Sequence, residues 1–220
     1  MLSAESRLKR EDSFQFEARL DSDLAESVAA LKQCFERRQI PAQFGQAPAQ
    51  LIDELKTKLR LPRRYRAFLS KCDPVECETR TPAERVRLLP SSELLQEQED
   101  FALEGGELID APRANGWRPT WVIIGHSSLL GDPYFLDVSE SDAEGDCPVY
   151  TAMSGTDTWQ AKMCASSFAM FLRVLSVTME VAEGFNDTQL DYEDEFVFRE
   201  ALGPKIREYD PAALKAGHWT

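Results

Sequence analysis

The amino-acid sequence predicts a single α+β domain in which helices pack on one mostly antiparallel sheet, with helical extensions at both ends. Three observations predict this class. The chain has 220 residues, of which 43% are hydrophobic and 29% are charged, which is enough apolar material for one substantial core. Apolar residues recur at helical spacing toward both ends of the chain. The middle holds short β-branched and aromatic runs, and the loops between them are too short for the crossovers of a parallel sheet.

The first third of the chain is expected to be helical. Residues 21–38 carry apolar side chains at three- and four-residue spacing, which is typical of an amphipathic helix. A linker with Pro41 and Gly45 follows, and a second helix is expected from Pro48 until Pro62 stops it and begins a third. The apolar positions of these three helices are Leu24, Val28, Leu31, Phe35, Leu51, Ile52, Leu55, Leu59, Tyr65, Phe68 and Leu69.

Short strands are expected in the middle, and one long helix after them. Residues 85–89 alternate like a strand, and a short helix should begin at Ser91. Three runs of β-branched or aromatic residues follow, at 121–124, 134–138 and 148–151, and we expect them to be neighbours in one antiparallel sheet. A wide apolar stripe then predicts a core helix from position 166 to position 182 that packs on this sheet.

Charge is unevenly distributed along the chain. There are 38 acidic and 25 basic residues, which give a formal net charge of −13 at pH 7. This charge excludes a free-standing nucleic-acid binder, because its long-range field repels phosphates, and it favours a cationic partner. Residues 91–110, 131–147 and 180–198 contain many acids and no base, whereas residues 56–71 contain seven bases and no acid. Either the acidic windows are independent solvated faces, or some of them converge into an acidic docking face.

The cysteines and the first residues predict a reduced, cytoplasmic protein. The five cysteines are odd in number and lack the spacing of a disulfide framework, which indicates free thiols. Charged residues occupy the place where a signal peptide needs an apolar run, and no apolar stretch is long enough to span a bilayer. No cysteine and histidine cluster has metal-ligand spacing, so we expect neither a metal nor another cofactor.

Catalytic signals are weak. Residues 125–129, with the letters GHSSL, superficially resemble a hydrolase nucleophile elbow around Ser127, but Leu129 stands where that motif needs glycine. The only later histidine is His218, close to the C-terminus, so we expect a hairpin turn here and no catalytic residue. The acidic loop 137–146 fails the residue spacing of a calcium-binding EF-hand.

An ordered series of motifs resembles a known family. The motifs are L-P-R-R-Y-R-A-F-L at 61–69, W-V-I-I-G at 121–125, G-D-P-Y-F-L-D at 131–137, P-V-Y at 148–150, Trp159, and S-F-A-M-F-L at 167–172. In this order and spacing they resemble the SUKH superfamily, which includes the Smi/Knr-type fungal cell-wall assembly regulators and bacterial immunity proteins. The similarity divides the chain into an N-terminal helical extension (1–45), a SUKH-like α+β domain (46–184) and an acidic C-terminal extension (185–220).

The resemblance implies a non-enzymatic protein-binding module. Bacterial members of this superfamily neutralise toxins, often nucleases, whereas fungal members act as signalling scaffolds. A nuclease carries a basic surface for phosphate contact, and an acidic protein can occupy that surface. We therefore expect a cognate protein as the partner, in the first place a cationic toxin domain, and no direct contact with nucleic acid or a membrane. The oligomeric state stays open.

Two sets of residues are candidates for these roles. The expected structural positions are Trp121, Gly125, Gly131 and Phe171, and the expected partner-binding positions are Trp117, Asp132, Asp137, Glu140, Asp142 and Glu144. We expect positive φ angles at both glycines, and we expect one of Trp117 and Trp121 to lie in the core while the other lines a groove. Three hypotheses remain: an immunity-type or scaffold binding module, a hydrolase that uses Ser127 or a carboxylate pair, and a small-ligand sensor.

Overall fold

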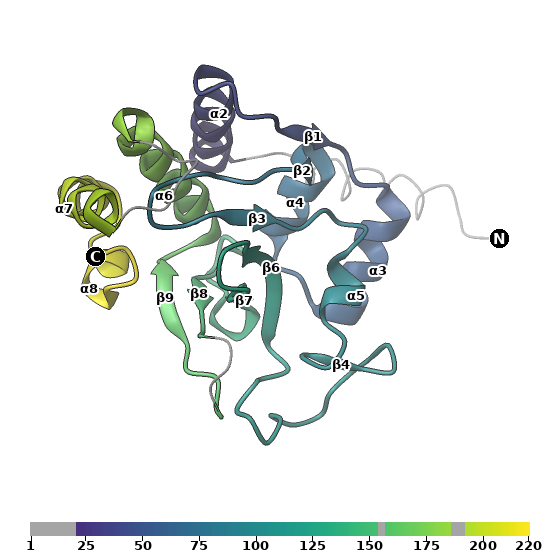
Figure 1. The fold of residues 1–220 in the computed structure, drawn as a ribbon. Coiled ribbons are helices and arrows are strands. Elements are labelled where there is room, and N and C mark those ends of the chain that lie inside the picture. The colour runs from purple at the N-terminus through teal and green to yellow at the C-terminus, as the bar shows by residue number, and fades with distance from the viewer. Residues whose placement is uncertain (1–20, 154–156, 186–191) are drawn as a thin grey trace.

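The centre of the fold is a five-stranded antiparallel sheet with the strand order β3-β6-β7-β8-β9 (Figure 1). The computed structural model describes residues 21–153, 157–185 and 192–220. The strands of the sheet are β3 (Val86–Leu88), β6 (Trp121–Ser127), β7 (Pro133–Asp137), β8 (Val149–Thr151) and β9 (Lys162–Ala165). The predicted α+β class is confirmed, and so is the expectation that the strands near Val122, Phe135 and Val149 are neighbours.

Side chains of a strand alternate between the two faces of a sheet, and other side chains cover both faces of this sheet. On one face Tyr134 of β7 contacts Phe171 of α6 (Phe168–Val181), with ring centroids 5.5 Å apart. On the other face Phe135 stacks on Trp121 at 4.7 Å and lies 5.0 Å from Trp117. All five residues of β7 are buried as a result.

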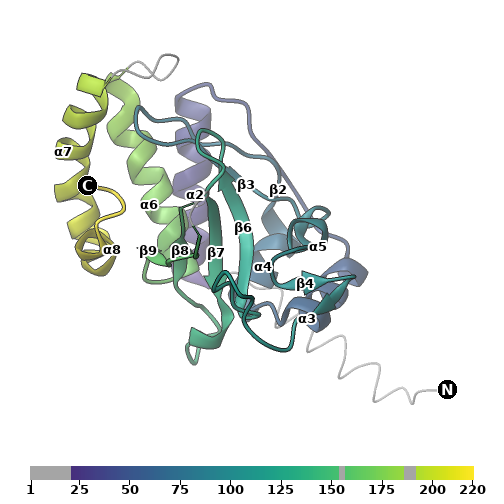
Figure 2. The ribbon, with the colours of Figure 1, turned by 60° about the horizontal axis from the view of Figure 1, so that its bottom comes forward.

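The helix α6 carries apolar side chains on most of its sides, and other elements surround it. It lies between α2 (Ser22–Arg37) and α7 (Tyr192–Tyr209), as both ribbon views show (Figures 1 and 2). The helix α4 (Arg63–Cys72) packs beside its first turn, where Tyr65 and Phe68 meet Phe168 at 4.8 and 5.1 Å. A helix that is hydrophobic almost all round belongs in a core, and α6 occupies that place.

Residues near the C-terminus pack against the last strand of the sheet. The helix α8 (Pro211–Ala216) lies beside β9. The indole N–H of Trp219 donates a 2.8 Å hydrogen bond to the backbone carbonyl of Cys164 in β9, and Trp219 is buried. Asp210 caps α8 and also accepts a hydrogen bond from the backbone N–H of Ser166. The C-terminal helices therefore contribute to the core.

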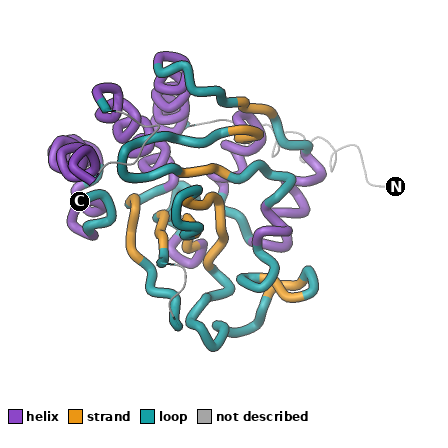
Figure 3. Tube along the Cα trace, in the orientation of Figure 1, coloured by secondary structure: helices purple, strands orange, loops and turns teal. Residues whose placement is uncertain are grey.

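Several short elements complete the fold, and Figure 3 shows their strands among long loops. They are α3 (Ala49–Leu59), α5 (Leu94–Glu97), β1 (Gln43–Gly45) paired with β2 (Asp73–Glu76), the hairpin of β4 (Leu103–Glu104) and β5 (Glu107–Leu108), and the 3-10 turns η1 (Val138–Glu140) and η2 (Ala182–Gly184). The strand β1 falls in the expected linker. The helix α5 has four residues, because the chain turns at Gln98, whose side chain bonds to Ile123 of β6.

The two motif glycines behave differently. Gly131 has a φ of +76°, as expected for the turn before β7. The expectation of a positive φ at Gly125 is wrong, because Gly125 lies inside β6 at an irregularity in the pairing with β7. A Cβ atom at this position would lie 2.7 Å from the backbone oxygen of Arg87 in β3. Gly125 therefore allows a close approach of two backbones.

The thiols agree with the expectation from the sequence. All five cysteines are buried and unpaired. Among the helices in the described ranges, none combines the length and apolarity that crossing a bilayer demands. Within the same ranges, no group of three or more histidine, cysteine or acidic side chains is arranged to hold a metal ion.

Candidate functional site

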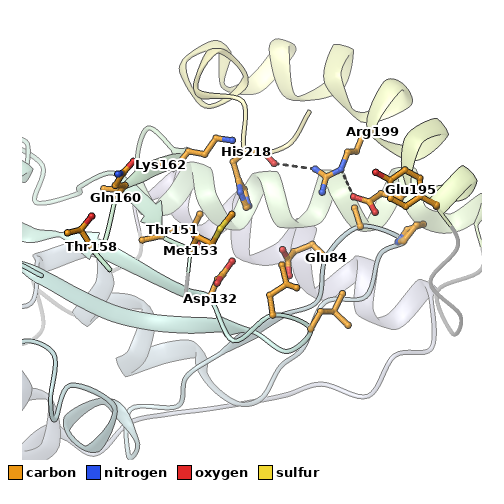
Figure 4. Close-up of a pocket in the computed structure, with 17 residues that line it drawn as sticks. Glu84, Asp132, Thr151, Met153, Thr158, Gln160, Lys162, Glu195, Arg199 and His218 are labelled. Carbon is orange, nitrogen blue, oxygen red and sulfur yellow. Dashed lines mark hydrogen bonds and ion pairs between the residues drawn. The ribbon is translucent and has the colours of Figure 1, made fainter. Parts of the chain in front are cut away.

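A cleft of about 1010 Å³ opens between the β8–β9 side of the sheet and the C-terminal helices (Figure 4). We call it the β9 cleft. Its lining comes from the loop before β3, the turn between β6 and β7, the end of β8, the approach to β9, the helix α7 and the C-terminal turn. The lining residues are Pro82, Ala83, Glu84, Leu129, Leu130, Asp132, Thr151, Ala152, Met153, Thr158, Gln160, Ala161, Lys162, Tyr192, Glu195, Arg199 and His218.

Two lining residues of the β9 cleft, Glu84 and His218, contact the buried side chains of Ser127 and Tyr134. The hydroxyl of Ser127 donates a 2.6 Å hydrogen bond to Glu84, and the hydroxyl of Tyr134 lies 3.1 Å from Nε2 of His218. Burial raises the pKa of Glu84, and the nearby carboxylate of Asp132 raises it further. Hydrogen bonds from the side chains of Ser127 and Tyr134 and from the backbone N–H of Arg85 act in the opposite direction. The Glu84 carboxyl therefore keeps its proton to a higher pH than an exposed glutamate does.

His218 is neutral at physiological pH. Burial lowers the pKa of His218 to about 3, and the nearby charges of Arg199 and Lys162 lower it as well. Both cations are held by the C-terminal turn. Nζ of Lys162 donates to the carbonyl of Gly217 at 2.7 Å, and Arg199 donates to the carbonyl of His218 at 3.2 Å and to Glu195 at 2.9 Å. These bonds fix the wall that α7 and the C-terminus form.

The arrangement around Ser127 differs from a hydrolase triad, in which a histidine accepts the proton of the serine. Ser127 is the last residue of β6, so the expectation that it lies in the hairpin turn is wrong by one residue. Its hydroxyl donates to Glu84, while His126 pairs with Glu97 at 2.9 Å and His218 contacts Tyr134. No contact in this arrangement favours the hydrolase hypothesis.

Burial removes Trp117 and Asp137 from the predicted partner-binding set. The relative exposure of Trp117 is 0%, because its indole lies among aromatic rings and donates to the carbonyl of Trp121. Asp137 is 2% exposed, and its carboxylate accepts hydrogen bonds from the Trp121 indole and the backbone of Ser139. Both tryptophans belong to the core, so the expectation that one of them lines a groove is wrong. Asp137 holds the end of β7 in place.

The remaining predicted partner-binding residues lie at opposite ends of β7. Asp132 precedes this strand and lines the β9 cleft. Glu140, Asp142 and Glu144 follow the strand and are exposed in the loop after it. Five residues of extended chain span roughly 17 Å, so Asp132 does not join the other three in one patch.

The loop that carries Glu140, Asp142 and Glu144 is fixed to the helical layer. Asp146 at its end is buried and accepts hydrogen bonds from the backbone N–H groups of Phe168 and Ala169 at the start of α6. The guanidinium of Arg64 donates to Asp146 at 3.2 Å and to Asp23 of α2 at 2.7 Å. Arg63 donates to the carbonyl of Glu144. Part of the basic run in α4 therefore pairs with acids of the same chain.

A second group of exposed acids lies near the same end of β6 as this loop. Glu104, Glu107 and Asp110 belong to the β4–β5 hairpin and the residues after it. Phe101, just before the hairpin, contacts Trp117 at 4.7 Å, and the Trp117 indole bonds to Trp121 at the start of β6. The acidic loop joins the same point, because the N–H of Val138 donates to the carbonyl of Thr120.

We call the exposed acids of these two segments the acidic end. Its members are Glu104, Glu107, Asp110, Glu140, Asp142 and Glu144. Arg118 is the exposed cation close to it, and its guanidinium lies over the Trp121 ring and 4.0 Å from Asp137. Arg113 donates to the carbonyls of Phe101 and Leu103, and its guanidinium also lies 3.9 Å from the carboxylate of Glu104. Part of the third acidic window of the sequence lies outside the described residues, and its C-terminal part is on α7.

The comparison of the sequence with protein-family models gives one finding. The model of the SMI1 / KNR4 family (SUKH-1) matches residues 47–174, which is more than half of the chain. The matched range covers the sheet and α3 to α6 up to its middle, and it ends before α7. A comparison with curated proteins finds no match.

Proposed function

The chain belongs to the SMI1/KNR4 family (SUKH-1), and from this premise we propose that it is an immunity-type protein that binds and neutralises a cognate, cationic, nuclease-like toxin. Proteins of this family are often immunity proteins and are generally non-catalytic. In this role the protein works in the cytoplasm of the cell that it protects, needs no cofactor, and covers part of the toxin's surface.

The observation that carries the proposal is the combination of this family with a formal net charge of −13. A nuclease binds its substrate through basic side chains that contact phosphates. A protein with an acidic face can cover those side chains, and long-range attraction accelerates the encounter. The same charge disfavours direct binding of this protein to nucleic acid.

The acidic end is the face that we assign to the toxin. Its six carboxylates lie on two segments that meet at the start of β6. Two cations lie beside them, the exposed Arg118 and the partly buried Arg113, which pairs with Glu104. The loop with Glu140, Asp142 and Glu144 is held by Asp146, Arg63 and the start of α6. A fixed loop loses little conformational entropy on binding, which favours affinity.

The proposal is tested by co-expression with a cationic, nuclease-like toxin domain, which is to be sought among the genes next to that of this protein. We expect the wild-type chain to restore growth and to form a complex with the purified toxin domain. The triple variant Glu140→Lys, Asp142→Lys, Glu144→Lys should protect poorly.

A matched control changes the net charge by the same amount at exposed positions on helices, with Glu26→Lys, Glu36→Lys and Glu200→Lys. The control should protect like the wild type. Equal loss of protection in both triple variants would assign the effect to overall charge, and no protection by the wild-type chain would contradict the immunity role.

A small-ligand sensor is the second candidate, and the β9 cleft favours it. Its volume is at the upper end of the range of small-molecule sites, roughly 300–1,000 Å³. Thermal unfolding measured against a panel of small polar metabolites tests this candidate, because a ligand that binds only the folded state raises the melting temperature. A regulatory scaffold, as in fungal relatives, would bind a protein that is not a toxin, and the growth assay separates the two roles.

A further inference from the structure

We propose that Glu140 and Tyr150 together form the binding position for an arginine side chain of the partner protein. The carboxylate of Glu140 pairs with the guanidinium of that arginine, and the partly exposed side chain of Tyr150 packs against its methylene groups. This inference rests on the proposed function, because it takes the partner to be a cationic protein that docks at the acidic end. It adds the side chain that is recognised there.

The face of the sheet that points away from α6 is only partly covered at β8 and β9. A row of direct cross-strand partners crosses this face from Ile123 through Phe135 and Tyr150 to Met163. Ile123 and Phe135 are buried, whereas Tyr150 and Met163 are partly exposed. Direct partners lie about 5 Å apart, so Tyr150 and Met163 form one adjoining apolar surface. Tyrosine and methionine are enriched in protein interfaces.

Tyr150 holds the side chain of Glu140. The hydroxyl of Tyr150 donates to the carboxylate of Glu140, and its oxygen lies 3.1 and 3.2 Å from the two carboxylate oxygens. Burial and the nearby charge of Glu140 raise the pKa of Tyr150 to about 12, so the hydroxyl keeps its proton at neutral pH. A carboxylate has about four acceptor positions, and the exposed Glu140 therefore still accepts hydrogen bonds from a partner.

The turn that carries Glu140 is fixed as well. Glu140 is the last residue of η1, and the carboxylate of Asp137 caps this turn by accepting from the backbone N–H of Ser139. Asp137 is buried, and the indole N–H of Trp121 donates to it at 2.9 Å. Glu140 is thus held through its backbone and through its carboxylate. A group that is held in this way loses little conformational freedom on binding.

A fixed carboxylate beside an apolar surface favours arginine over lysine. A guanidinium presents a planar fork of N–H donors that matches both oxygens of a carboxylate, whereas an ammonium is a compact point charge. The methylene groups of the side chain pack on apolar surface while its head stays polar. The protein holds one of its own arginines similarly, since Arg118 lies 5.2 Å from the centroid of the Trp121 ring and 4.0 Å from the Asp137 carboxylate.

The surrounding charges favour a cation at this position. Asp142 and Glu144 follow Glu140 in the same exposed loop. Lys162, the neighbour of Met163 in β9, donates to the carbonyl of Gly217 at 2.7 Å. An arginine of the partner therefore meets more negative than positive charge here, which favours its approach.

The test uses the full-length protein and N-acetyl-arginine methylamide as the probe. The lysine analogue of the probe carries a cation without the planar fork, and the citrulline analogue keeps the shape of arginine without its charge. Backbone NMR spectra identify the amides that each probe perturbs, and titrations give the relative affinities. Ionic strength is kept constant, because salt screens exposed charges.

We expect the arginine probe to perturb the amides of residues 139–141, 150 and 163. It should bind about threefold more tightly than the lysine analogue, because only the guanidinium matches the carboxylate in two places. The citrulline analogue should bind more weakly than both cations, because it cannot form an ion pair.

Variants separate the two members of the site from general charge. Glu140→Gln should weaken binding of the arginine probe about fivefold, as expected for an exposed ion pair. Glu144→Gln, an equal charge change in the same exposed loop, is the matched control and should leave binding nearly unchanged. Tyr150→Phe keeps the ring but releases the carboxylate, and it should weaken binding about threefold.

A double variant separates positioning from a merely structural role of Tyr150. The hydroxyl of Tyr150 acts through Glu140, so Tyr150→Phe should have no further effect on probe binding once Glu140→Gln is present. Additive effects of the two substitutions would contradict the positioning role. Thermal unfolding of each variant checks that it is folded.

Several results would overturn this inference. They are equal binding of the arginine probe and either analogue, equal effects of Glu140→Gln and Glu144→Gln, unchanged binding by Tyr150→Phe, or perturbations confined to other surfaces. Because the probes test the position without the toxin, such results leave the growth assay of the proposed function unaffected. A preference for arginine in a chain that gives no protection would keep this binding position and contradict the immunity role.

Discussion

Replacement of Asp146 by alanine should destabilise the fold and release the loop of the acidic end. Asp146 is 1% exposed. Its carboxylate accepts hydrogen bonds from the N–H groups of Phe168 (2.8 Å) and Ala169 (3.2 Å) at the start of α6, and from Arg64 at 3.2 Å. The carboxylate thus joins the loop, α4 and α6.

The expected size of the effect follows from these contacts. Loss of a helix N-terminal cap costs about 0.5–2 kcal/mol, and hydrogen bonds to a charged group contribute about 1.5–3 kcal/mol. Arg64 keeps its bonds to Asp21 and Asp23 in the variant, so it is not left as a buried unpaired charge. We therefore expect Asp146→Ala to lower the free energy of unfolding by about 2–4 kcal/mol, and Asp146→Asn to lower it by less, because asparagine retains one acceptor oxygen.

Urea denaturation measures this effect. The midpoint should fall by about 1 M or more with an unchanged slope, because the slope reflects the surface exposed on unfolding. Glu144→Ala, an exposed acid of the same loop, is the control and should change stability by no more than about 0.5 kcal/mol. Equal midpoints for Asp146→Ala and Glu144→Ala would refute the assignment of Asp146 as the link between the loop and α6.

Three further predictions concern the sheet and the cleft. Gly125→Ala should cost about 1–3 kcal/mol, because the new Cβ atom meets the backbone of Arg87, whereas Gly184→Ala has open space and should cost little; urea midpoints compare the two. The buried His218 has a pKa lowered to about 3, below that of the unfolded chain, so its contribution to stability is complete above about pH 6.5 and is lost as the pH falls toward 3. His218→Gln should therefore reduce the loss of stability between about pH 7 and pH 5, measured by urea midpoints at each pH, by about 2 kcal/mol. Ser127→Ala removes the bond to Glu84 and should cost about 1 kcal/mol of stability while changing the affinity for the toxin domain less than about tenfold, measured by titration calorimetry.

These three predictions have clear contradicting results. Similar midpoints of the two glycine variants would show that β3 and β6 can separate at no cost. Parallel stability curves of wild type and His218→Gln would show that the histidine is not buried in its neutral form. A loss of toxin affinity of more than about tenfold in Ser127→Ala would support the hydrolase hypothesis.

The regular elements were predictable because their signals are local. The helix expected over residues 166–182 is observed as Phe168–Val181, since its apolar stripe and the capping serine Ser167 lie in one continuous stretch. The strand β9 was missed because K-M-C-A contains no β-branched residue and its position depends on pairing with β8. The strand β1 was missed for the same kind of reason, because its partner β2 is far along the chain.

The sites were harder to predict because they are assembled from distant segments. Trp117 and Trp121 look alike in sequence, but Phe101 and Trp159 cover Trp117 from separate loops. The β9 cleft combines residues from before β3 to the C-terminal turn, and no local motif marks it. Tyr134 was recognised only as a strand residue, and its contact with His218 joins positions 84 residues apart.

The most direct test of the central claim is the association rate of this protein with the toxin domain, measured by stopped-flow mixing across a range of ionic strengths. If the acidic end meets a cationic partner, the wild-type rate should fall steeply with added salt. The variant with Glu140, Asp142 and Glu144 changed to lysine should associate more slowly and depend less on salt, while the variant with Glu26, Glu36 and Glu200 changed to lysine should keep most of the wild-type dependence. An association rate that does not respond to salt, or that responds equally in the two variants, would contradict the assignment of the acidic end as the docking face.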